Sequence, residues 1–522
     1  MKPTSLLHRS KLGTFALVAT LTTSANAATL LYSVGAATGN EALGSAIVSL
    51  GDLNGDGVGD FAISDPKFDV TGSTTATNSG QVLIINGKDG TTLFTLQGTV
   101  AANQQFGTSL AAIHADSDTT LDLAVGAPGG NGAVYIYSGA TGTLIRTITD
   151  PTPEANSLFG VSIANAGDQN GDGKADLFIG ASGASTQDGA VFVVSGATGA
   201  LINEILPTTA DARFGASIAT VSDLNADGKA DLTVGSPGFS ANLGRLQIVE
   251  SDTGLELDVL AGSLAGLQLG GSVSAVGDRD NDGKIDLIVS SATGGSAFLV
   301  SGATLNTLTT LSLVGGTPGF PVVGSGPIDV DQDGDTELLI GYPGALPVAH
   351  VDVVPSPTAP EPNVYEADQA GSGLGLAIAV IPDLGFAMGE PLLNGGAVHV
   401  YAVGNVGGVD TDGDGVADAE DECPNSILTP TVIIGDRDSG VENVVDEHGC
   451  SIADLLAKLE PEGGYRNHGQ FVSKATQLFK TLRAEGLISK QDQQKLQKAA
   501  AQSNVGKPEK KAKEPKQKNK KK

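Results

Sequence analysis

The chain has 522 residues, of which 59 are acidic and 30 basic, and a formal net charge of −29. This length exceeds one ordinary compact core, so several domains or a repeat array are expected. The acidity argues against nucleic acid as a partner of the main body, and the two cysteines exclude a disulfide-dense scaffold.

The first 27 residues have the features of a secretory signal peptide. Basic residues precede an apolar stretch from Leu12 to Leu21, and Ala25-Asn26-Ala27 forms an A-x-A cleavage signal. Cleavage after Ala27 predicts a protein exported by a bacterium to the periplasm, the cell surface or the medium. An uncleaved membrane anchor is the alternative, but the apolar stretch is shorter than the roughly 20 residues of a spanning helix. No transmembrane segment is predicted in the mature chain.

Seven similar openings divide residues 28–405, and their second positions are 51 to 63 residues apart. These openings are Leu43-Gly44, Phe106-Gly107, Phe159-Gly160, Phe214-Gly215, Leu269-Gly270, Phe320-Pro321 and Leu374-Gly375. A second marker, Gly-Ala-Pro at 126–128 in its clearest copy, follows each opening. In the third repeat we predict strands at Val161–Ala166, Leu177–Ile179, Ala190–Val194 and Leu201–Leu206. Four short strands in each repeat are typical of propeller blades.

The two ends of this array complement each other. The seventh unit ends at its third strand, residues 397–403, whereas Thr29–Val34 matches a fourth strand. We therefore predict an all-β fold, a seven-bladed β-propeller over residues 28–405 that the N-terminal strand closes. A linear array is the alternative, but it leaves sheet edges unpaired at both ends.

Five repeats carry an Asp-rich loop of the form D-x-[DN]-x-D-G-x-x-[DE], with positions six and seven read loosely. Alternating oxygen side chains on a tight turn suit Ca²⁺, which takes about six to eight oxygens, and the absence of His and Cys argues against zinc or copper. The predicted ligands, including the position-seven backbone carbonyls, are Asp52, Asn54, Asp56, Val58 and Asp60; Asp168, Asn170, Asp172, Lys174 and Asp176; Asp223, Asn225, Asp227, Lys229 and Asp231; Asp278, Asp280, Asp282, Lys284 and Asp286; and Asp329, Asp331, Asp333, Asp335 and Glu337.

Two alternatives remain for these loops: polar turns that bind no ion, and calcium that only clips each blade together. The second repeat, with His114, Asp116, Asp118 and Asp122, has lost a residue and the glycine, so a site there is not expected. The seventh repeat is shortened around Asp383 and is predicted to have no site.

Residues 406–460 contain another acidic loop and both cysteines. Carboxylates stand at positions 1, 3, 5, 9 and 12 of an EF-hand-like loop, and the predicted ligands are Asp410, Asp412, Asp414, Val416 (through its carbonyl), Asp418 and Asp421. About six Ca²⁺ ions are thus predicted in all. In an exported protein Cys423 and Cys450 are expected to form a disulfide worth about 3 kcal/mol; two free thiols are the alternative.

The rest of the chain changes character. Residues 461–506 are predicted to be helical, with apolar residues at a 3.6 period from Val472 to Leu482 and a capping start at Ser489. Residues 507–522 form a Lys-rich tail that we predict to be disordered. It is either solvated without a dedicated target or in contact with anionic lipid or acidic polysaccharide.

The Phe-Gly openings, the Asp-rich loops and the Gly-Ala-Pro markers resemble FG-GAP repeats, the blades of the integrin alpha propeller, over about residues 29–405. The loop 410–421, followed by Glu422-Cys423-Pro424, resembles a thrombospondin type 3 repeat. The first resemblance implies calcium in the hairpin loops, a role in adhesion or ligand binding, and a ligand face opposite these loops. The longer turn Asp65–Gly80 would lie on that face and is a candidate recognition loop, with an ordinary surface loop as the alternative.

The function predicted from the sequence is adhesion or recognition of an extracellular protein or polysaccharide by a secreted or surface-bound, calcium-binding monomer. A structural component of the envelope or matrix without a specific ligand is the alternative. Catalysis is not expected, because the five histidines after residue 27 stand in no recognisable hydrolase motif. A hydrolase with an unrecognised site is the least favoured possibility.

Overall fold

The computed structural model describes residues 28–35, 42–69, 77–98, 101–184, 188–208, 212–263, 267–291, 296–312, 322–323, 328, 330, 336–342, 350–354, 364–366, 372–392, 395–403, 423, 429–445, 450–459, 465–484 and 487–507. Contacts divide the chain into two compact units, residues 1–404 and residues 405–522.

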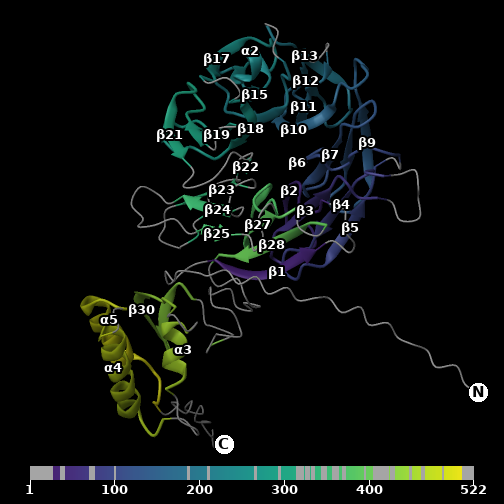
Figure 1. The fold of residues 1–522 in the computed structure, drawn as a ribbon. Helices are drawn as coiled ribbons and strands as arrows, with labels where there is room; N and C mark the ends of the chain where they lie inside the picture. Colours follow the sequence, from purple (N-terminus) through teal and green to yellow (C-terminus); the bar gives the residue numbers. More distant parts are fainter. Residues whose placement is uncertain are drawn as a thin grey trace, which may run out of the picture. The chain divides into compact units, whose positions relative to one another are not determined.

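The described strands of the first unit form four-stranded antiparallel sheets that follow one another around a ring (Figure 1). Six of these sheets have strands of at least four residues. They are, in hydrogen-bonded order, β2 (Ile47–Gly51), β3 (Asp60–Asp65), β4 (Gln81–Ile85) and β5 (Thr92–Leu96); β6 (Ser109–Ile113), β7 (Asp122–Ala127), β8 (Ala133–Tyr137) and β9 (Leu144–Thr149); β10 (Phe159–Gly167), β11 (Asp176–Ala181), β12 (Ala190–Val194) and β13 (Leu201–Ile205); β14 (Ser217–Thr220), β15 (Leu232–Ser236), β16 (Arg245–Val249) and β17 (Glu256–Ala261); β18 (Leu269–Ala275), β19 (Leu287–Ser291), β20 (Ser296–Val300) and β21 (Thr307–Ser312); and β26 (Ile378–Ile381), β27 (Gly385–Gly389), β28 (Ala397–Ala402) and β1 (Thr29–Gly35). A short helix, α2 (Phe239–Asn242), joins β15 to β16.

The prediction of a seven-bladed propeller is wrong, because the structure supports a six-bladed one. The remaining sheet is rudimentary in the described residues: β23 (Leu338–Tyr342) and β24 (His350–Val354) are flanked by β22 (Val322–Val323), of two residues, and β25 (Val364–Glu366), of three. This irregular sheet belongs to the repeat whose opening, Phe320-Pro321, has proline in place of glycine.

The chemistry of that substitution explains the difference. In three regular blades the N–H of the opening glycine donates to a carbonyl near the end of the second strand: from Gly44 to Ser64 (2.9 Å), from Gly107 to Gly126 (2.9 Å) and from Gly375 to Gly389 (2.8 Å). Pro321 has no N–H, so it cannot form the equivalent hydrogen bond.

The predicted pairing of the first strand with the last sheet is confirmed. Strand β1 pairs antiparallel with β28, with Val34 opposite Val398 and Ser33 opposite His399. The last sheet also contacts the first blade, where a Cβ added to Gly389 would lie 2.0 Å from the carbonyl oxygen of Gly44. The N-terminal strand therefore completes the sheet that meets the first blade.

The strand sequences explain which strand lies inside. The second strands β3, β7, β11 and β15 are buried along their whole length, and apolar residues make up most of their central positions. The fourth strands β5, β9 and β13 are exposed or half-buried except for one buried residue each, and they lie at the outer edge of their sheets. In the third repeat the predicted strands are confirmed, although β10 and β11 extend further at both ends.

The Phe-Gly openings hold neighbouring blades together. Phe159 is fully buried, and the carbonyl of Gly160 accepts a hydrogen bond of 2.8 Å from the Ser109 hydroxyl of the preceding blade. Gly126 lies against the same carbonyl, so that a Cβ there would come within 2.1 Å of it. The serine contact recurs at the next two junctions, from Ser162 to Gly215 and from Ser217 to Gly270. The opening and the second marker are thus two halves of one contact between blades.

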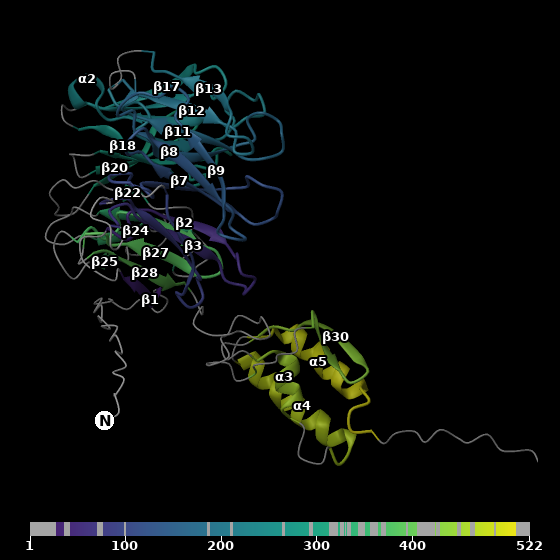
Figure 2. The same ribbon diagram turned by 90° about the vertical axis from the view of Figure 1, so that its right-hand side faces the viewer.

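The described residues of the second unit form a hairpin and three helices (Figure 2). These elements are β29 (Thr431–Ile434), β30 (Arg437–Glu442), α3 (Ile452–Ala457), α4 (His468–Ala484) and α5 (Lys490–Gln502). One hydrophobic cluster joins Val432 of the hairpin to Phe471 and Phe479 of α4 and Leu496 of α5. The predicted helical pair and the cap at Ser489, whose hydroxyl accepts a hydrogen bond from the N–H of Asp492, are confirmed.

The sequence analysis missed the hairpin and α3. The signal for the hairpin was present, since the β-branched run Thr431–Ile434 is followed by Gly435-Asp436. The predicted disulfide between Cys423 and Cys450 is confirmed.

Candidate metal centres

Four of the predicted calcium loops lie within the described residues, and all join the first strand of a blade to its second. They connect β2 to β3, β10 to β11, β14 to β15, and β18 to β19. Because strands alternate in direction, these loops lie at the same edge of their blades and therefore on one face of the ring.

The loop of the third repeat shows how the backbone orders the acidic side chains. Asp168 accepts hydrogen bonds from the N–H groups of Gly171 (2.7 Å), Asp172 (3.1 Å) and Gly173 (2.8 Å). These donors, that of Gly173 foremost, hold the pKa of Asp168 below its ordinary value. Gly173 has a φ of 80°, which glycine adopts without strain.

The same arrangement recurs in the neighbouring loops. The first aspartate accepts from Gly55, Asp56 and Gly57 in the loop of Asp52, and from Ala226, Asp227 and Gly228 in the loop of Asp223. In the loop of Asp278 the donors include the N–H groups of Asp282 and Gly283. The backbone thus holds a carboxylate at position one of every described loop.

The ninth-position aspartates have a different environment. Asp60, Asp176, Asp231 and Asp286 are fully buried. Asp176 accepts hydrogen bonds from the backbone N–H groups of Gln169 (2.8 Å) and Gly196 (3.1 Å), and so ties the loop to the turn after the third strand. Burial raises the pKa of Asp60, Asp176 and Asp231. These residues therefore support the fold as well as being predicted ligands.

The loop of the fifth repeat brings three predicted ligands together. Asp278, Asp280 and Asp282 are exposed, and each has a carboxylate oxygen within 4.8 Å of the others. Desolvation and then the charge of Asp286 raise the pKa of Asp280. A divalent cation placed among these oxygens would remove the repulsion between them, and hard oxygen donors are what Ca²⁺ prefers. The residues present therefore fit a calcium ion.

The fourth repeat gathers a different set. Asp227 lies with Glu250 and Asp252 of the β16–β17 turn, again with carboxylate oxygens within 4.8 Å. The sequence analysis did not name Glu250 or Asp252, because the loop pattern ends before them. The repeats do contain a signal for them. Glu250 and Asp252 follow the third strand of the blade, and the turn after a third strand lies at the same edge as the Asp-rich loops.

The second repeat differs in part from the prediction made for it. No site was expected there, yet Asp116, Asp118 and Asp122 also have carboxylate oxygens within 4.8 Å of one another. Asp122 keeps the role of the ninth-position aspartate, since it is buried and accepts from the N–H groups of Ala115 (2.9 Å) and Gly139 (3.2 Å). The shortened loop thus preserves the buried anchor.

Two predicted sites cannot be compared with the structure. Asp329, Asp331, Asp333 and Asp335 lie outside the described residues, as does the whole loop 410–421. Of the sixth-repeat ligands only Glu337 is described; it is buried and accepts a hydrogen bond of 2.7 Å from the N–H of Val330. In the predicted recognition loop Asp65–Gly80, residues 70–76 are likewise outside the described residues.

A serine, a histidine and a glutamate form a hydrogen-bonded chain at the sheet that β1 completes. The Nδ1 of His399 lies 2.9 Å from the Ser33 hydroxyl, and its Nε2 lies 3.0 Å from the Glu390 carboxylate. His399 and Glu390 are buried, whereas Ser33 is exposed. No sequence pattern indicates this contact, because the Ser33–His399 hydrogen bond joins positions 366 residues apart. Because these hydrogen bonds cross the β1–β28 pairing, they help to hold the N-terminal strand in the sheet, and we call Ser33, His399 and Glu390 the clasp.

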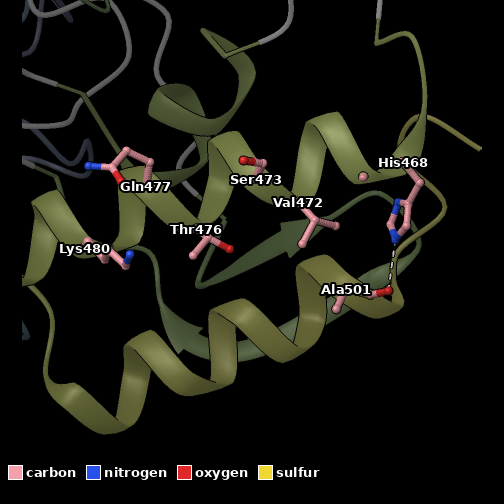
Figure 3. Close-up of a pocket in the computed structure, with 8 residues that line it drawn as sticks. His468, Val472, Ser473, Thr476, Gln477, Lys480 and Ala501 are labelled. Atoms are coloured by element: carbon pink, nitrogen blue, oxygen red, sulfur yellow. Dashed lines mark hydrogen bonds between the residues drawn. The ribbon is translucent and has the colours of Figure 1, made fainter.

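The second unit has a groove along α4 (Figure 3). His468, Val472, Thr476, Lys480 and Ala501 are among its lining residues, and its volume is about 560 Å³. His468 closes one end, where its ring nitrogens lie 2.7 Å from the Val505 carbonyl oxygen and 3.0 Å from that of Ala501. Among the described residues, no helix is both long and apolar enough to cross a membrane.

A sequence profile for the FG-GAP repeat matches residues 159–194 and 214–249. These segments are FG-GAP repeats. The chain is 33% identical to integrin alpha-5 of Xenopus laevis over 221 residues, which cover 38% of this chain and 20% of that protein. It is 31% identical to integrin alpha-V of Gallus gallus over 209 residues (36% and 20%) and 34% identical to integrin alpha-E of Mus musculus over 154 residues (25% and 13%).

The predicted resemblance is confirmed for the propeller, which is of the FG-GAP, integrin alpha type. The chain spans a fifth or less of the length of these relatives. The likeness of residues 410–421 to a thrombospondin type 3 repeat stays a prediction.

Proposed function

We propose that this chain is a calcium-binding β-propeller, secreted or held at the surface of a bacterium, that recognises an extracellular ligand or mediates adhesion. The observation that carries the proposal is the repeated loop in which backbone N–H groups order a first-position aspartate at the same edge of four blades. The similarity to integrin alpha subunits supports a recognition role. Like the predicted signal peptide, export remains part of the proposal.

Calcium is assigned to the five blade loops and to the loop 410–421, about six sites in all. The carboxylates that meet at Asp278, Asp280 and Asp282 support this assignment. A bound ion would stabilise the folded blades, because it binds the folded chain and not the unfolded one. Catalysis forms no part of the proposal.

The metal assignment is tested by thermal unfolding of residues 28–522 with calcium and with chelator. We expect a higher midpoint in calcium. The variant Asp282→Ala should lose part of that gain, while Glu204→Gln, which removes an exposed carboxylate from β13, should keep it. Equal midpoints in calcium and chelator would refute the assignment.

The recognition role is tested by binding residues 28–522 to an array of glycans and matrix proteins. Saturable binding that requires calcium supports the proposal and names the class of ligand. If a folded protein binds nothing in either condition, the role is structural, in the envelope or matrix.

A further inference from the structure

A small pocket lies on the propeller face opposite the Asp-rich loops. It is lined by Leu158, Arg213 and Gln268, which directly precede the openings of three consecutive blades, and by Ser182 and Pro237, which directly follow β11 and β15. These positions mark the edge where first strands begin and second strands end. The Asp-rich loops mark the other edge, because they join the end of a first strand to the start of the second.

The backbone at the pocket is unusual and repeated. Leu158, Arg213 and Gln268 have φ values of 57°, 74° and 51°, in the left-handed region that non-glycine residues seldom adopt. Such a conformation is strained for a residue other than glycine and is kept only where the surrounding structure fixes it. The turn is anchored here by hydrogen bonds from Val161 to the Leu158 carbonyl and from Ala216 to the Arg213 carbonyl. Each blade therefore presents one side chain from a fixed backbone position.

The chemistry of the lining is specific to these three repeats. Among the described residues, none that lines the pocket carries a carboxylate, although the chain has 59 acidic residues. Arg213 is exposed and forms no ion pair within the part of the chain that the structure describes. Its lining residues include the apolar Leu158 and Pro237, the buried Ser182, which carries a hydroxyl, and Gln268, which carries an amide. A guanidinium beside a hydroxyl and an amide is a set that receives a carboxylate.

The size of the pocket limits what enters it. Its volume is about 140 Å³, well below the roughly 300 Å³ at which pockets for whole small molecules begin. One side chain fits this space, and the apolar walls suit its methylene groups.

We propose that Arg213 and the pocket around it receive the carboxylate of an aspartate or glutamate side chain from a protein partner. The inference rests on the recognition function proposed above and adds the chemistry of one contact and its location. Arg213 would hold the carboxylate through paired N–H donors, Ser182 and Gln268 would complete its hydrogen bonds, and Leu158 and Pro237 would pack on the aliphatic part.

The test uses residues 28–522 in calcium and N-acetyl-glutamate methylamide as the probe, with binding followed by saturation-transfer NMR. We expect weak saturable binding and at least about tenfold weaker binding in Arg213→Gln, since a hydrogen bond to a charged group is lost. Glutamine is compatible with this backbone, because Gln105 and Gln268 occupy the equivalent positions with φ values of 54° and 51°. Arg437→Gln is the matched control, as Arg437 is exposed and lies in the second unit; it should bind as the wild type does.

Three results would overturn the inference: unchanged binding in Arg213→Gln, no binding of the glutamate probe, or binding of methyl glucuronide in its place, which would assign the pocket to an acidic polysaccharide. The ligand array separates this inference from the proposed function. If Arg213→Gln binds an array ligand as tightly as the wild type, recognition stands and the pocket assignment falls. If the wild type binds the probe but nothing on the array, the pocket stands and the recognition function falls.

Discussion

Replacing Asp176 by alanine should destabilise its blade whether or not calcium is present. The side chain is fully buried, and its carboxylate accepts from two buried backbone N–H groups, those of Gln169 (2.8 Å) and Gly196 (3.1 Å). Alanine leaves both donors without a partner, at a cost of about 1–3 kcal/mol each. Burial also raises the pKa of Asp176, which shows that burying the charged carboxylate has a cost. That cost offsets part of the stabilisation that its hydrogen bonds provide. We therefore expect a net loss of about 3 kcal/mol.

Hydrogen exchange measured by mass spectrometry is the suitable assay, because a ring of blades need not unfold in one step. A loss of 3 kcal/mol corresponds to roughly 150-fold faster exchange in the blade, where exchange follows opening. The matched variant is Asp172→Ala. That side chain is exposed and accepts from the Lys174 N–H at 2.9 Å, so its removal should cost less than about 1 kcal/mol in chelator.

In chelator, the exchange rates of the two variants should therefore differ. In calcium, both variants should lose the protection against exchange that the bound ion adds to the wild type. Wild-type protection of peptides containing Gln169 and Gly196 in chelator-treated Asp176→Ala would refute the reasoning. It would mean that the buried carboxylate contributes only as a ligand.

Three further predictions concern other parts of the chain. His399→Leu leaves the buried carboxylate of Glu390 without its partner and should cost about 3–5 kcal/mol, seen as faster amide exchange in β1; unchanged exchange there would contradict the clasp. Cys450→Ser removes the disulfide, whose half-cystines are 27 positions apart, and should destabilise the second unit by about 3.5 kcal/mol in denaturant titrations; reducing the wild type should have the same effect. Ser489→Ala removes the N-cap of α5 and should cost about 1 kcal/mol, measured by exchange in α5. The Ser489 hydroxyl holds the pKa of Asp492 below its ordinary value. The stabilisation from this hydrogen bond is therefore present above the unfolded pKa of the Asp492 carboxyl and is lost as the pH falls through its folded pKa. Ser489→Ala lacks the hydrogen bond and should lose less stability on the acid side.

The sequence by itself determined the parts of this protein that depend on local pattern. Short apolar runs between glycine-rich turns set the strands, as at Ala190–Val194, which was predicted with both ends correct. The Asp-rich loops were found because the residues that order Asp168 are its own neighbours at positions 171–173. The missing fourth strand of the last unit predicted the pairing of β1 with β28, since an open sheet edge needs a partner.

The tertiary structure decided what depends on distant residues meeting. The clasp of Ser33, His399 and Glu390 joins two ends of the propeller chain, and Glu250 and Asp252 reach Asp227 only because a neighbouring turn ends at the same edge. The rudimentary sheet around β23 and β24 was missed because the repeat spacing continues through it, although Pro321 in its opening was a signal present in the sequence. The pocket at Arg213 takes its lining from three successive blades. A repeat fixes what each blade presents, but the packing of blades around the ring decides which of those side chains share a site.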